Sequence, residues 1–395
     1  MAVEPDLLVA LRHDLHAHPE LRFEEDRTSD IVAGQLASWG YRPHRGLAKT
    51  GVVTSLDTGR PGPSILLRAD MDALPITERA DHDHVSRHAG RMHACGHDGH
   101  TVMLLGAAAE LAARPPACGR VHFVFQPGEE GGAGADVMIR EGLFTLFPAD
   151  RCFGLHNWPG LEAGRFGVRA GPIMAGGWRF AVTILGRGAH AAQPHRSIDP
   201  VVAGAAFVQA AQQLVARRTD PLVPAVVSVC TFHAGSTDNI LPDRAELAGT
   251  IRALDATALD ALKQGLRDVA EGTARVFGVH IDISFHSPYP VTVNSPAEAE
   301  LAGQVMRSLD DASQVAPAER NVPPSLASED FGFMLRRRPG AYAMIGNGAS
   351  APLHAPDYDF NDWIIPRGIA YWTALARHCL SGNDHNITQQ EETPS

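Results

Sequence analysis

A change of rhythm along the chain constrains its fold more than any other feature of the sequence. From residue 1 to about 177, helix-like stretches alternate with short runs that are apolar along their whole length: SILLRAD (64–70), VHFVFQ (121–126) and RCFGLH (151–156), with TVMLLGAAAELAAR (101–114) as a helical stretch between them. Strands without a polar face are typical of a parallel sheet covered by helices. The sequence therefore predicts an α/β fold with a mostly parallel sheet flanked by helices.

Between about 178 and 293 the order of elements becomes βαββαβ. The predicted strands are WRFAVTILG, AVVSVCTFHAG, AELAGTIRAL and HIDISFH, and the helices are PVVAGAAFVQAAQQLVARR and DATALDALKQGLRDVAEGTARVFG. This order is the ferredoxin-like unit, which forms a complete small domain. We expect residues 178–293 to be inserted into a first domain made of residues 1–177 and 294–382. The polar stretch 383–395 has no apolar period and is expected to be a disordered tail.

Composition excludes several classes of function. With 395 residues and 44% hydrophobic content the chain is long enough for two domains. The net charge of -11, with both signs interspersed, leaves no basic stripe for nucleic acid. Neither Lys49 nor Lys263 follows a glycine-rich phosphate-binding loop, which argues against a P-loop nucleotide hydrolase.

The expected location is the cytoplasm. The N-terminal stretch MAVEPDLLVALRHDLH has acidic residues where a signal peptide needs basic ones, and no run approaches the roughly 20 apolar residues of a membrane-spanning helix. Five scattered cysteines are too few for a disulfide framework in a chain of this length. A reducing compartment and no membrane partner are therefore expected.

Metal-type side chains follow the predicted strands. Because ligands of open α/β sheets bind beyond the carboxyl ends of the strands, these are the residues of interest. They are Asp70, then Cys95, His97, Asp98 and His100 at the mouth of a helix, Glu129 and Glu130, His156, and His354. Thiolate, imidazole and carboxylate ligands together suit zinc or a similar first-row divalent ion.

A family resemblance rests on seven segments that run in order along the chain. They are LRADMDALPI, MHACGHDGHT, QPGEEGGAGA, GLHNWP, GAHAAQPH, DNILPD and LHAPDYDF. Together they resemble the amidohydrolase branch of the dinuclear metallopeptidase superfamily, which includes aminoacylase-like enzymes, hippurate hydrolases and plant auxin-conjugate hydrolases. The resemblance extends from residue 18 to residue 362. It implies that the insert is a lid or dimerisation domain and that the protein is a homodimer or dimer-based oligomer.

The resemblance also implies the ligands of two divalent ions. Cys95 would bridge them, with His97 and His156 on one ion and Glu130 and His354 on the other. Zinc, manganese, cobalt and nickel all suit this set. Distant relatives carry a histidine ligand where this chain has Arg68, and use an aspartate as the bridge. Asp70 is therefore expected to orient a ligand imidazole without binding metal itself.

The implied reaction is hydrolysis of the amide bond of an N-acyl amino acid of the N-acetyl or N-benzoyl type. Two ions can activate a shared water and polarise the amide carbonyl. By the resemblance Glu129 is the general base, and His190, acting in its own or a neighbouring active site, contacts the oxyanion. Asn239 and Arg252 would hold polar groups of the substrate, with the guanidinium gripping a carboxylate.

Three alternatives stay open at this point. The nearest is a dipeptidase, or a deacetylase of an N-acetylated biosynthetic intermediate, on the same two metals. A catalytically silent metal-binding or regulatory protein is disfavoured by the presence of Glu129. A cysteine hydrolase built on Cys95 and His97 is disfavoured because two residues in one turn rarely align as nucleophile and base.

Other histidines are expected to have no role at the site. A packed or solvated helix face accounts for His13, His16 and His18 at the end of the first helix. The histidine-dense loop that precedes Cys95 could recruit metal, but an exposed polar connection is the preferred interpretation; its members are His82, His84, His88 and His93. Ser328 is expected to cap a helix.

Overall fold

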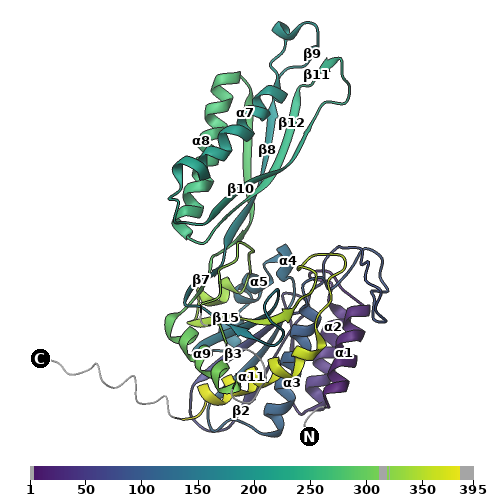
Figure 1. Cartoon of the computed structure of the whole chain (residues 1–395), viewed down its shortest axis with the longest axis vertical. Helices are drawn as coiled ribbons and strands as arrows, with labels where there is room; N and C mark the ends of the chain where they lie inside the picture. The colour runs from purple at the N-terminus through teal and green to yellow at the C-terminus, as the bar shows by residue number, and fades with distance from the viewer. Residues whose placement is uncertain (1–3, 311–317, 320, 383–395) are drawn as a thin grey trace, which may run out of the picture. The chain divides into compact units, whose positions relative to one another are not determined.

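The computed structural model describes residues 4–310, 318–319 and 321–382, and the chain divides into two compact units (Figure 1). The first unit comprises Met1–Gly171, Val293–Pro323 and Phe333–Ser395, and the second comprises Pro172–Thr292 and Pro324–Gly332. The domain boundaries drawn from the sequence stay predictions. The expected tail at 383–395 lies outside the described residues.

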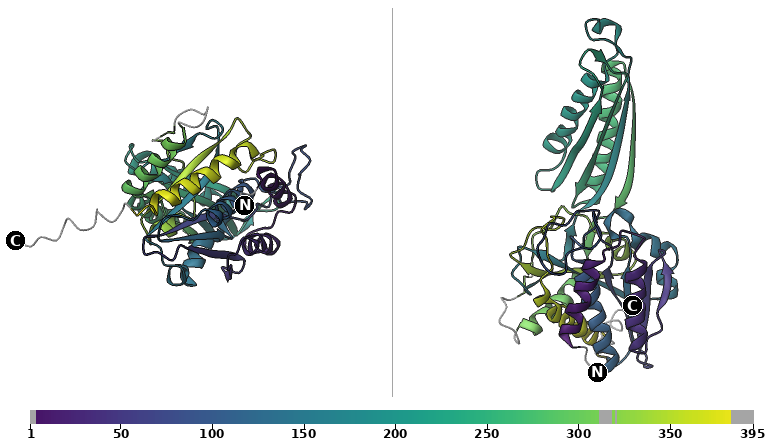
Figure 2. Two further views of the ribbon diagram at one scale, coloured as in Figure 1. Left: turned by 90° about the horizontal axis from the view of Figure 1, so that it is seen from below. Right: turned by 90° about the vertical axis from the view of Figure 1, so that its right-hand side faces the viewer.

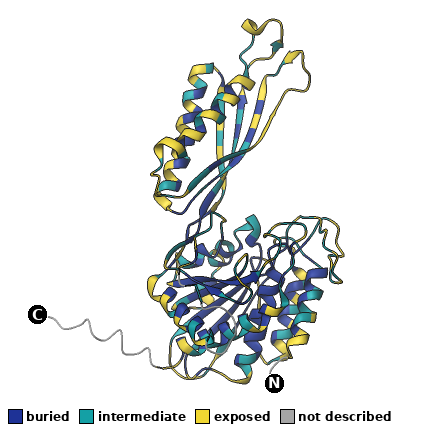
Figure 3. Cartoon of the chain, viewed as in Figure 1, coloured by how far each residue is buried: buried dark blue, intermediate teal, exposed yellow. Residues whose placement is uncertain are grey.

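Across the described residues, the first unit is built on a seven-stranded sheet. Its order is β1 (His44–Leu47), β2 (Gly51–Asp57), β4 (Arg120–Gln126), β3 (Ser64–Asp70), β5 (Arg151–Pro159), β15 (Gly340–Gly348) and β6 (Phe166–Gly167). The four strands β4, β3, β5 and β15 are parallel, whereas β1, β2 and β6 pair antiparallel at the edges. The expected α/β fold is confirmed. The parallel strands are buried over most of their length, in agreement with their largely apolar sequences (Figure 3).

Helices flank this sheet. They are α1 (Pro5–Ala17), α2 (Asp26–Ser38), α3 (His97–Ala113), α4 (Glu129–Gly132), α5 (Gly134–Arg140), α6 (Leu143–Leu146), α9 (Pro296–Asp310), α10 (Gly332–Leu335) and α11 (Ile365–Cys379), with a 3-10 turn at Asp362–Ile364. The central helix α3 packs against α1, α2, α11 and the strand β3. Its sequence is apolar on all sides because it is buried along most of its length. The expected cap at Ser328 is wrong, since α10 begins at Gly332.

The second unit is a four-stranded antiparallel sheet with two helices. The sheet order is β10 (Ala225–Ala234), β12 (Arg244–Ala253), β8 (Gly176–Leu185) and β13 (His280–Tyr289). The helices α7 (Pro200–Gln213) and α8 (Ala256–Phe277) pack on this sheet (Figure 2). The chain order β8-α7-β10-β12-α8-β13 is the βαββαβ order expected from the sequence. The shorter elements are β7 (Gly171–Met174), β9 (Ala189–His190), β11 (Ile240–Leu241), β14 (Thr292–Asn294), a 3-10 turn at Pro194–Arg196 and a π-helical turn at Leu214–Arg218.

Each unit has its own hydrophobic core. In the second unit Phe180 and Phe207 are fully buried between the sheet and its helices. In the first unit the fully buried Phe123 and Phe153 lie on the parallel strands. No disulfide joins any of the five cysteines, all of which lie in the described residues. Among the described helices, none has both the length and the apolar character needed to cross a membrane.

Candidate metal centre

The parallel strands of the first unit deliver polar side chains to one edge of the sheet. Asp70 ends β3, His156 lies near the end of β5, and Glu129 follows β4 after a two-residue turn. Parallel strands have their carboxyl ends on the same edge, so these side chains meet there. The residues that the sequence predicted as ligands therefore lie at one edge of the sheet.

Cys95, His97 and His156 form one group of potential ligands, with the donor atoms within 4.8 Å of one another. The Nδ1 atom of His97 lies 2.8 Å from the carbonyl oxygen of Asp72, and that of His156 lies 2.6 Å from the carbonyl oxygen of Asn157. These carbonyls can only accept, so in the neutral ring each Nδ1 carries the proton and each Nε2 offers its lone pair as a metal ligand. The Sγ atom of Cys95 lies 3.5 Å from Nε2 of His156.

Cys95 also belongs to a second group, with Glu130 and His354. The carboxylate of Glu130 lies 3.0 Å from Nε2 of His354. His354 adopts a left-handed backbone with φ 67°, and its N–H donates to the carbonyl of Ala94 at 2.7 Å. This strained residue is held beside Cys95 by that bond. The thiol is therefore common to both groups, which is the arrangement that the resemblance implies.

The charges at this edge of the sheet favour the binding of cations. Burial raises the pKa of the Cys95 thiol well above its usual range, and the charges of Glu130 and Glu129 raise it further. Burial alone would lower the pKa of His97, but the charge of Asp70 and the contacts with Asp72 raise it to about 10. His97 Nε2 is buried and has no hydrogen-bond partner among the described residues. A buried excess of negative charge next to an orphaned imidazole nitrogen suits divalent cations.

Glu129 and Glu130 are held by the loop that follows β4. Gly128 has φ 65°, and a side chain there would collide with the ring of Phe23. The backbone N–H groups of Glu129 and Glu130 both donate to the carboxylate of Asp72, at 3.0 and 2.9 Å. Glu129 is buried, and the kink at Glu130, with ψ 76°, separates the paths of the two side chains. Adjacent glutamates can thus serve different roles.

Asp70 lies behind the ligand groups. Its Oδ1 atom is 2.6 Å from Nδ1 of His100, and its Oδ2 atom accepts from Arg68 at 2.7 Å and lies 3.6 Å from Nε2 of His97. The other nitrogen of His100 is 2.8 Å from Asn157 Oδ1. Since both nitrogens of His100 are occupied, Asp70 and His100 form a hydrogen-bonded pair beside His97 in preference to a further metal site. The pKa of Asp70 is well below its usual range because nearby positive groups outweigh its burial.

Asp72 is the residue that the sequence interpretation missed. It is buried, its carbonyl orients His97, and its carboxylate positions the loop that carries both glutamates. A signal was present, because Asp72 follows Asp70 by two residues directly after an apolar strand. Within a strand, alternate side chains point to opposite faces of the sheet, but Asp72 lies beyond the end of β3. The direction of its side chain, and therefore its hydrogen-bond partners, could not be predicted from the sequence.

His190 and Asn239 are neighbours within the second unit. The short strands β9 and β11 pair His190 with Ile240, and the N–H of Ala191 donates to the carbonyl of Asn239 at 3.1 Å. Both side chains are exposed. Two residues about 50 positions apart are thus brought to one tip of the unit. Their predicted roles toward substrate stay predictions.

Arg252 lies on β12, opposite Gly177 of β8 and Val226 of β10. Its Nη1 atom donates to the carbonyl of Leu326 at 3.1 Å and to Oγ of Ser328 at 2.9 Å. Burial, together with the neighbouring Arg179, lowers its pKa. The guanidinium is thus partly committed to the segment 324–332, and its role toward substrate stays a prediction.

Comparison with known proteins places this geometry in a family. The model of peptidase family M20/M25/M40 matches residues 66–378. The hippurate hydrolase of Campylobacter jejuni is 38% identical over 366 residues, which cover 93% of this chain and 94% of that protein. The N-acetyl-L-cysteine deacetylase of Bacillus subtilis is 36% identical over 381 residues, or 96% of this chain and 89% of that protein.

A solved structure agrees with the sequence matches. The crystal structure of a dinuclear metal-binding peptidase of the M20 family from Bacillus subtilis superimposes with a TM-score of 0.80 at 32% identity. The match covers 95% of this chain and 98% of that chain. The resemblance drawn from the seven segments is confirmed, and so is the expectation of a metal-dependent amidohydrolase. The chain belongs to peptidase family M20/M25/M40.

Proposed function

We propose that this enzyme hydrolyses the amide bond of N-acyl amino acids of the N-acetyl or N-benzoyl type. One observation carries the proposal: the shared thiol of Cys95 lies between two ligand groups, at a sheet edge where Glu129 is also held. The names of the two relatives supply the substrate class, since one is a hydrolase of N-benzoylglycine and the other removes an acetyl group from an N-acetyl amino acid.

Two divalent ions would be held by Cys95, with His97 and His156 on one side and Glu130 and His354 on the other. When bound, such ions activate water and polarise an amide carbonyl. Zinc, manganese, cobalt and nickel all suit a mixed thiolate, imidazole and carboxylate set. The rings of His97 and His156 are fixed by carbonyls at Nδ1, which leaves each Nε2 facing the site and supports this assignment.

Glu129 would act as general base and then as general acid. Its carboxylate would accept a proton from the attacking water and pass it to the leaving amine, so that the products are a carboxylate and an amino acid. Asp72 fixes the backbone of Glu129, and burial excludes competing water from its carboxylate. His190 would donate to the oxyanion, from its own chain or from a partner in a homodimer, while Asn239 and Arg252 would hold the polar groups of the substrate.

A thiol mechanism is less favoured by the same contacts. A nucleophilic cysteine needs a depressed pKa or a basic partner. Here burial and the neighbouring carboxylates raise the pKa of Cys95, and burial holds the pKa of the nearby His156 well below its usual range. Neither group would be charged without a cation. An unpaired Cys95 as ligand also supports a reducing compartment, and we propose a cytoplasmic location.

The test is a substrate panel with a matched pair of variants. The metal-loaded protein is assayed on N-benzoylglycine, N-acetyl amino acids and dipeptides, beside Glu129→Gln and the control Glu162→Gln on an exposed side chain. We expect N-acyl amino acids to be the best substrates, and Glu129→Gln to lose about 10²- to 10⁴-fold in kcat with unchanged metal content. Preference for dipeptides would favour the dipeptidase alternative, and preference for an N-acetylated biosynthetic intermediate the deacetylase alternative. Hydrolysis that survives complete removal of metal would favour the thiol mechanism.

A further inference from the structure

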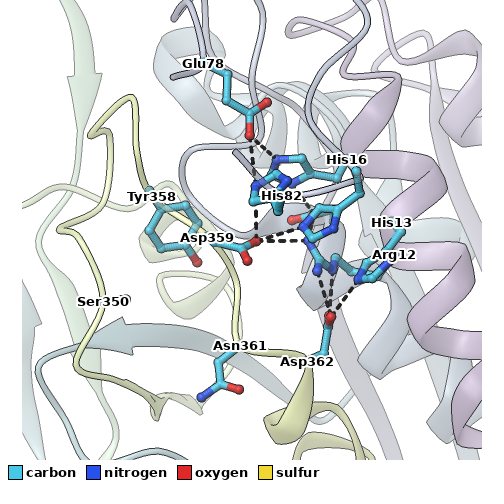
Figure 4. A network of polar contacts seen from close by, with 12 residues as sticks. Arg12, His13, His16, Glu78, His82, Ser350, Tyr358, Asp359, Asn361 and Asp362 are labelled. Atoms are coloured by element: carbon cyan, nitrogen blue, oxygen red, sulfur yellow. Dashed lines mark hydrogen bonds and ion pairs between the residues drawn. The ribbon is translucent and has the colours of Figure 1, made fainter. Parts of the chain in front are cut away.

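A second cluster of histidines lies outside the centre described above. His16 is buried near the end of α1, and Glu78 and His82 come from the loop between β3 and α3. The carboxylate atom Oε1 of Glu78 is 3.0 Å from Nε2 of His16 and 3.1 Å from Nε2 of His82 (Figure 4). The expected packed helix face holds for His16, but Glu78 and His82 of the loop expected to be exposed are mostly covered and converge on it.

The donor atoms of this cluster are close to the geometry of a metal site. All three lie within 4.8 Å of one another. Bonds of about 2.0–2.1 Å in a tetrahedron around zinc separate neighbouring donors by about 3.3 Å, so the observed 3.0 and 3.1 Å require little movement. The other oxygen of Glu78 accepts from the N–H of Ser86 at 2.7 Å, which fixes the carboxylate with Oε1 facing the two rings.

His16 carries the support that metal-binding histidines usually have. Its Nδ1 atom lies 2.8 Å from Oδ2 of the fully buried Asp98, while its Nε2 atom faces Glu78. A carboxylate behind the ring fixes the orientation and makes Nε2 a better ligand. His16 and Asp98 thus have the arrangement of a carboxylate–histidine–metal triad.

His82 supplies a second, independent observation. Both of its ring nitrogens are buried, and neither makes a hydrogen bond of regular geometry among the described residues, although Nε2 lies 3.1 Å from Oε1 of Glu78. Its ring stacks on that of His84, with centroids 3.6 Å apart, so its orientation is held by packing. Buried imidazole nitrogens are normally satisfied, and an orphan that points at a carboxylate and another imidazole indicates a missing partner.

The charge around the cluster is also unbalanced. Arg12 donates to Asp362 through two bonds of 2.7 and 2.8 Å, and it also pairs with Asp359 at 3.3 Å and with Asp98 at 3.6 Å. One guanidinium is thus shared by three carboxylates, and Glu78 adds a further negative charge beside the imidazoles. Asp359 Oδ1 is 3.1 Å from Nε2 of His84 and 3.8 Å from Nε2 of His82. A divalent cation would offset much of this negative charge.

We propose that His16, Glu78 and His82 bind a divalent transition-metal ion of the zinc type, at a site separate from the centre built on Cys95. Two imidazoles and one carboxylate suit zinc, cobalt or nickel. The fourth position is open to water or to Oδ1 of Asp359. The ion would be structural, since it would fasten the end of α1 to the loop that leads to Cys95.

Without an ion, a proton can hold the cluster together. Burial would lower the pKa of His16, but the charge of Asp98 and the hydrogen bonds to Asp98 and Glu78 raise it to about 9. A proton on each nitrogen would then bridge the two carboxylates. The rival account is therefore a network held by protons alone, which would bind no ion.

Zinc binding to the full chain separates these accounts without any activity assay. Zinc per chain is measured after equilibrium dialysis for the parent, His82→Asn and the control His88→Asn, which removes an exposed histidine of the same loop. We expect His82→Asn to bind about one zinc fewer than the parent, and His88→Asn to match the parent. Glu78→Gln is the second variant, and we expect the same loss from it.

The Cys95→Ser background makes the result independent of the proposed function. In that background we expect His82→Asn to remove the same single zinc, and to abolish a rise of several degrees in Tm that zinc produces in Cys95→Ser alone. The proposal is overturned if both His82→Asn and Glu78→Gln bind as much zinc as the parent, with the same affinity, in either background. A failure of the Cys95 centre would instead appear as unchanged zinc content on replacing Cys95.

Discussion

Replacing Asp72 by asparagine tests whether one buried carboxylate positions the catalytic loop. Its two oxygens accept from the N–H groups of Glu129 and Glu130 at 3.0 and 2.9 Å. Hydrogen bonds to a charged group contribute about 1.5–3 kcal/mol each. Asparagine keeps one oxygen and turns an NH₂ group toward the other N–H, so one bond is lost and two donors face each other. We expect Asp72→Asn to lower the free energy of unfolding by about 2–3 kcal/mol.

The effect on turnover should exceed what lost stability alone would cause. Groups that orient metal ligands typically contribute 10- to 100-fold to activity or metal affinity, and Asp72 positions His97 through its carbonyl as well as both glutamates. We therefore expect kcat/KM on an N-acyl amino acid to fall by about 10- to 100-fold. Steady-state assays and guanidinium unfolding of the same preparation measure both quantities.

A matched control is available on the following helix. Asp136 lies on α5 and forms an ion pair with Arg140, one turn away, at 3.0 Å. Asp136→Asn makes the same chemical change in a partly exposed pair, which should cost less than about 0.5 kcal/mol. If Asp72→Asn keeps kcat/KM within about twofold of the parent and unfolds with the same free energy, the positioning role assigned from these two bonds is wrong.

Two further changes test other parts of the first unit, at the start of β4 and at the start of α3. Burial lowers the pKa of His122 to about 4, so the unfolded chain, with a pKa near 6.5, binds the proton more tightly; the contribution of this residue to stability is present above pH 6.5 and is lost as the pH falls to 4. The difference between the two pKa values corresponds to about 3 kcal/mol of stability. In His122→Gln we expect the fall in the free energy of unfolding between pH 6.5 and pH 4 to be smaller than in the parent by about 3 kcal/mol. A fall as large as that of the parent would contradict the lowered pKa of His122. Gly96 has φ 86°, and a Cβ there would overlap the amide of Asn157, whereas Gly90, with φ 76°, has open space. Gly90→Ala should lower the free energy of unfolding by about 1–2 kcal/mol because of its left-handed backbone alone. Gly96→Ala should lower it by more and should also lose bound metal. An equal fall in Tm for the two variants would show that the side chain of Asn157 can move aside.

The parallel strands were predictable because burial on both faces leaves a continuous apolar run. The strands β3, β4 and β5 begin within one residue of their predicted starts. The edge strands β1 and β2 were not expected from the sequence. The strand β1 is largely exposed, and β2 is buried at one end only, so neither has the uninterrupted apolar pattern of the central strands.

The candidate site was predictable as a list of side chains but not as a set of contacts. Ligand-type residues at strand ends are visible in sequence because the strands themselves are. The role of Asp72 depends on bonds to the backbone of a loop 57 residues later, and no periodicity encodes such a bond. The convergence of the histidine cluster could not be predicted for the same reason. His16 meets Glu78 across 62 residues, and a helix face alone does not show which loop will cover it.

The first turn of α3 joins the two clusters. His97 and Asp98 are consecutive, and their side chains leave the helix in different directions: His97 to the carbonyl of Asp72, and Asp98 to His16. Consecutive residues of a helix point about 100° apart, so neither contact can shift without moving the backbone that serves the other. Buried groups on both sides therefore determine where His97 lies, and loosening His16 should disturb the metal centre even though the two share no ligand.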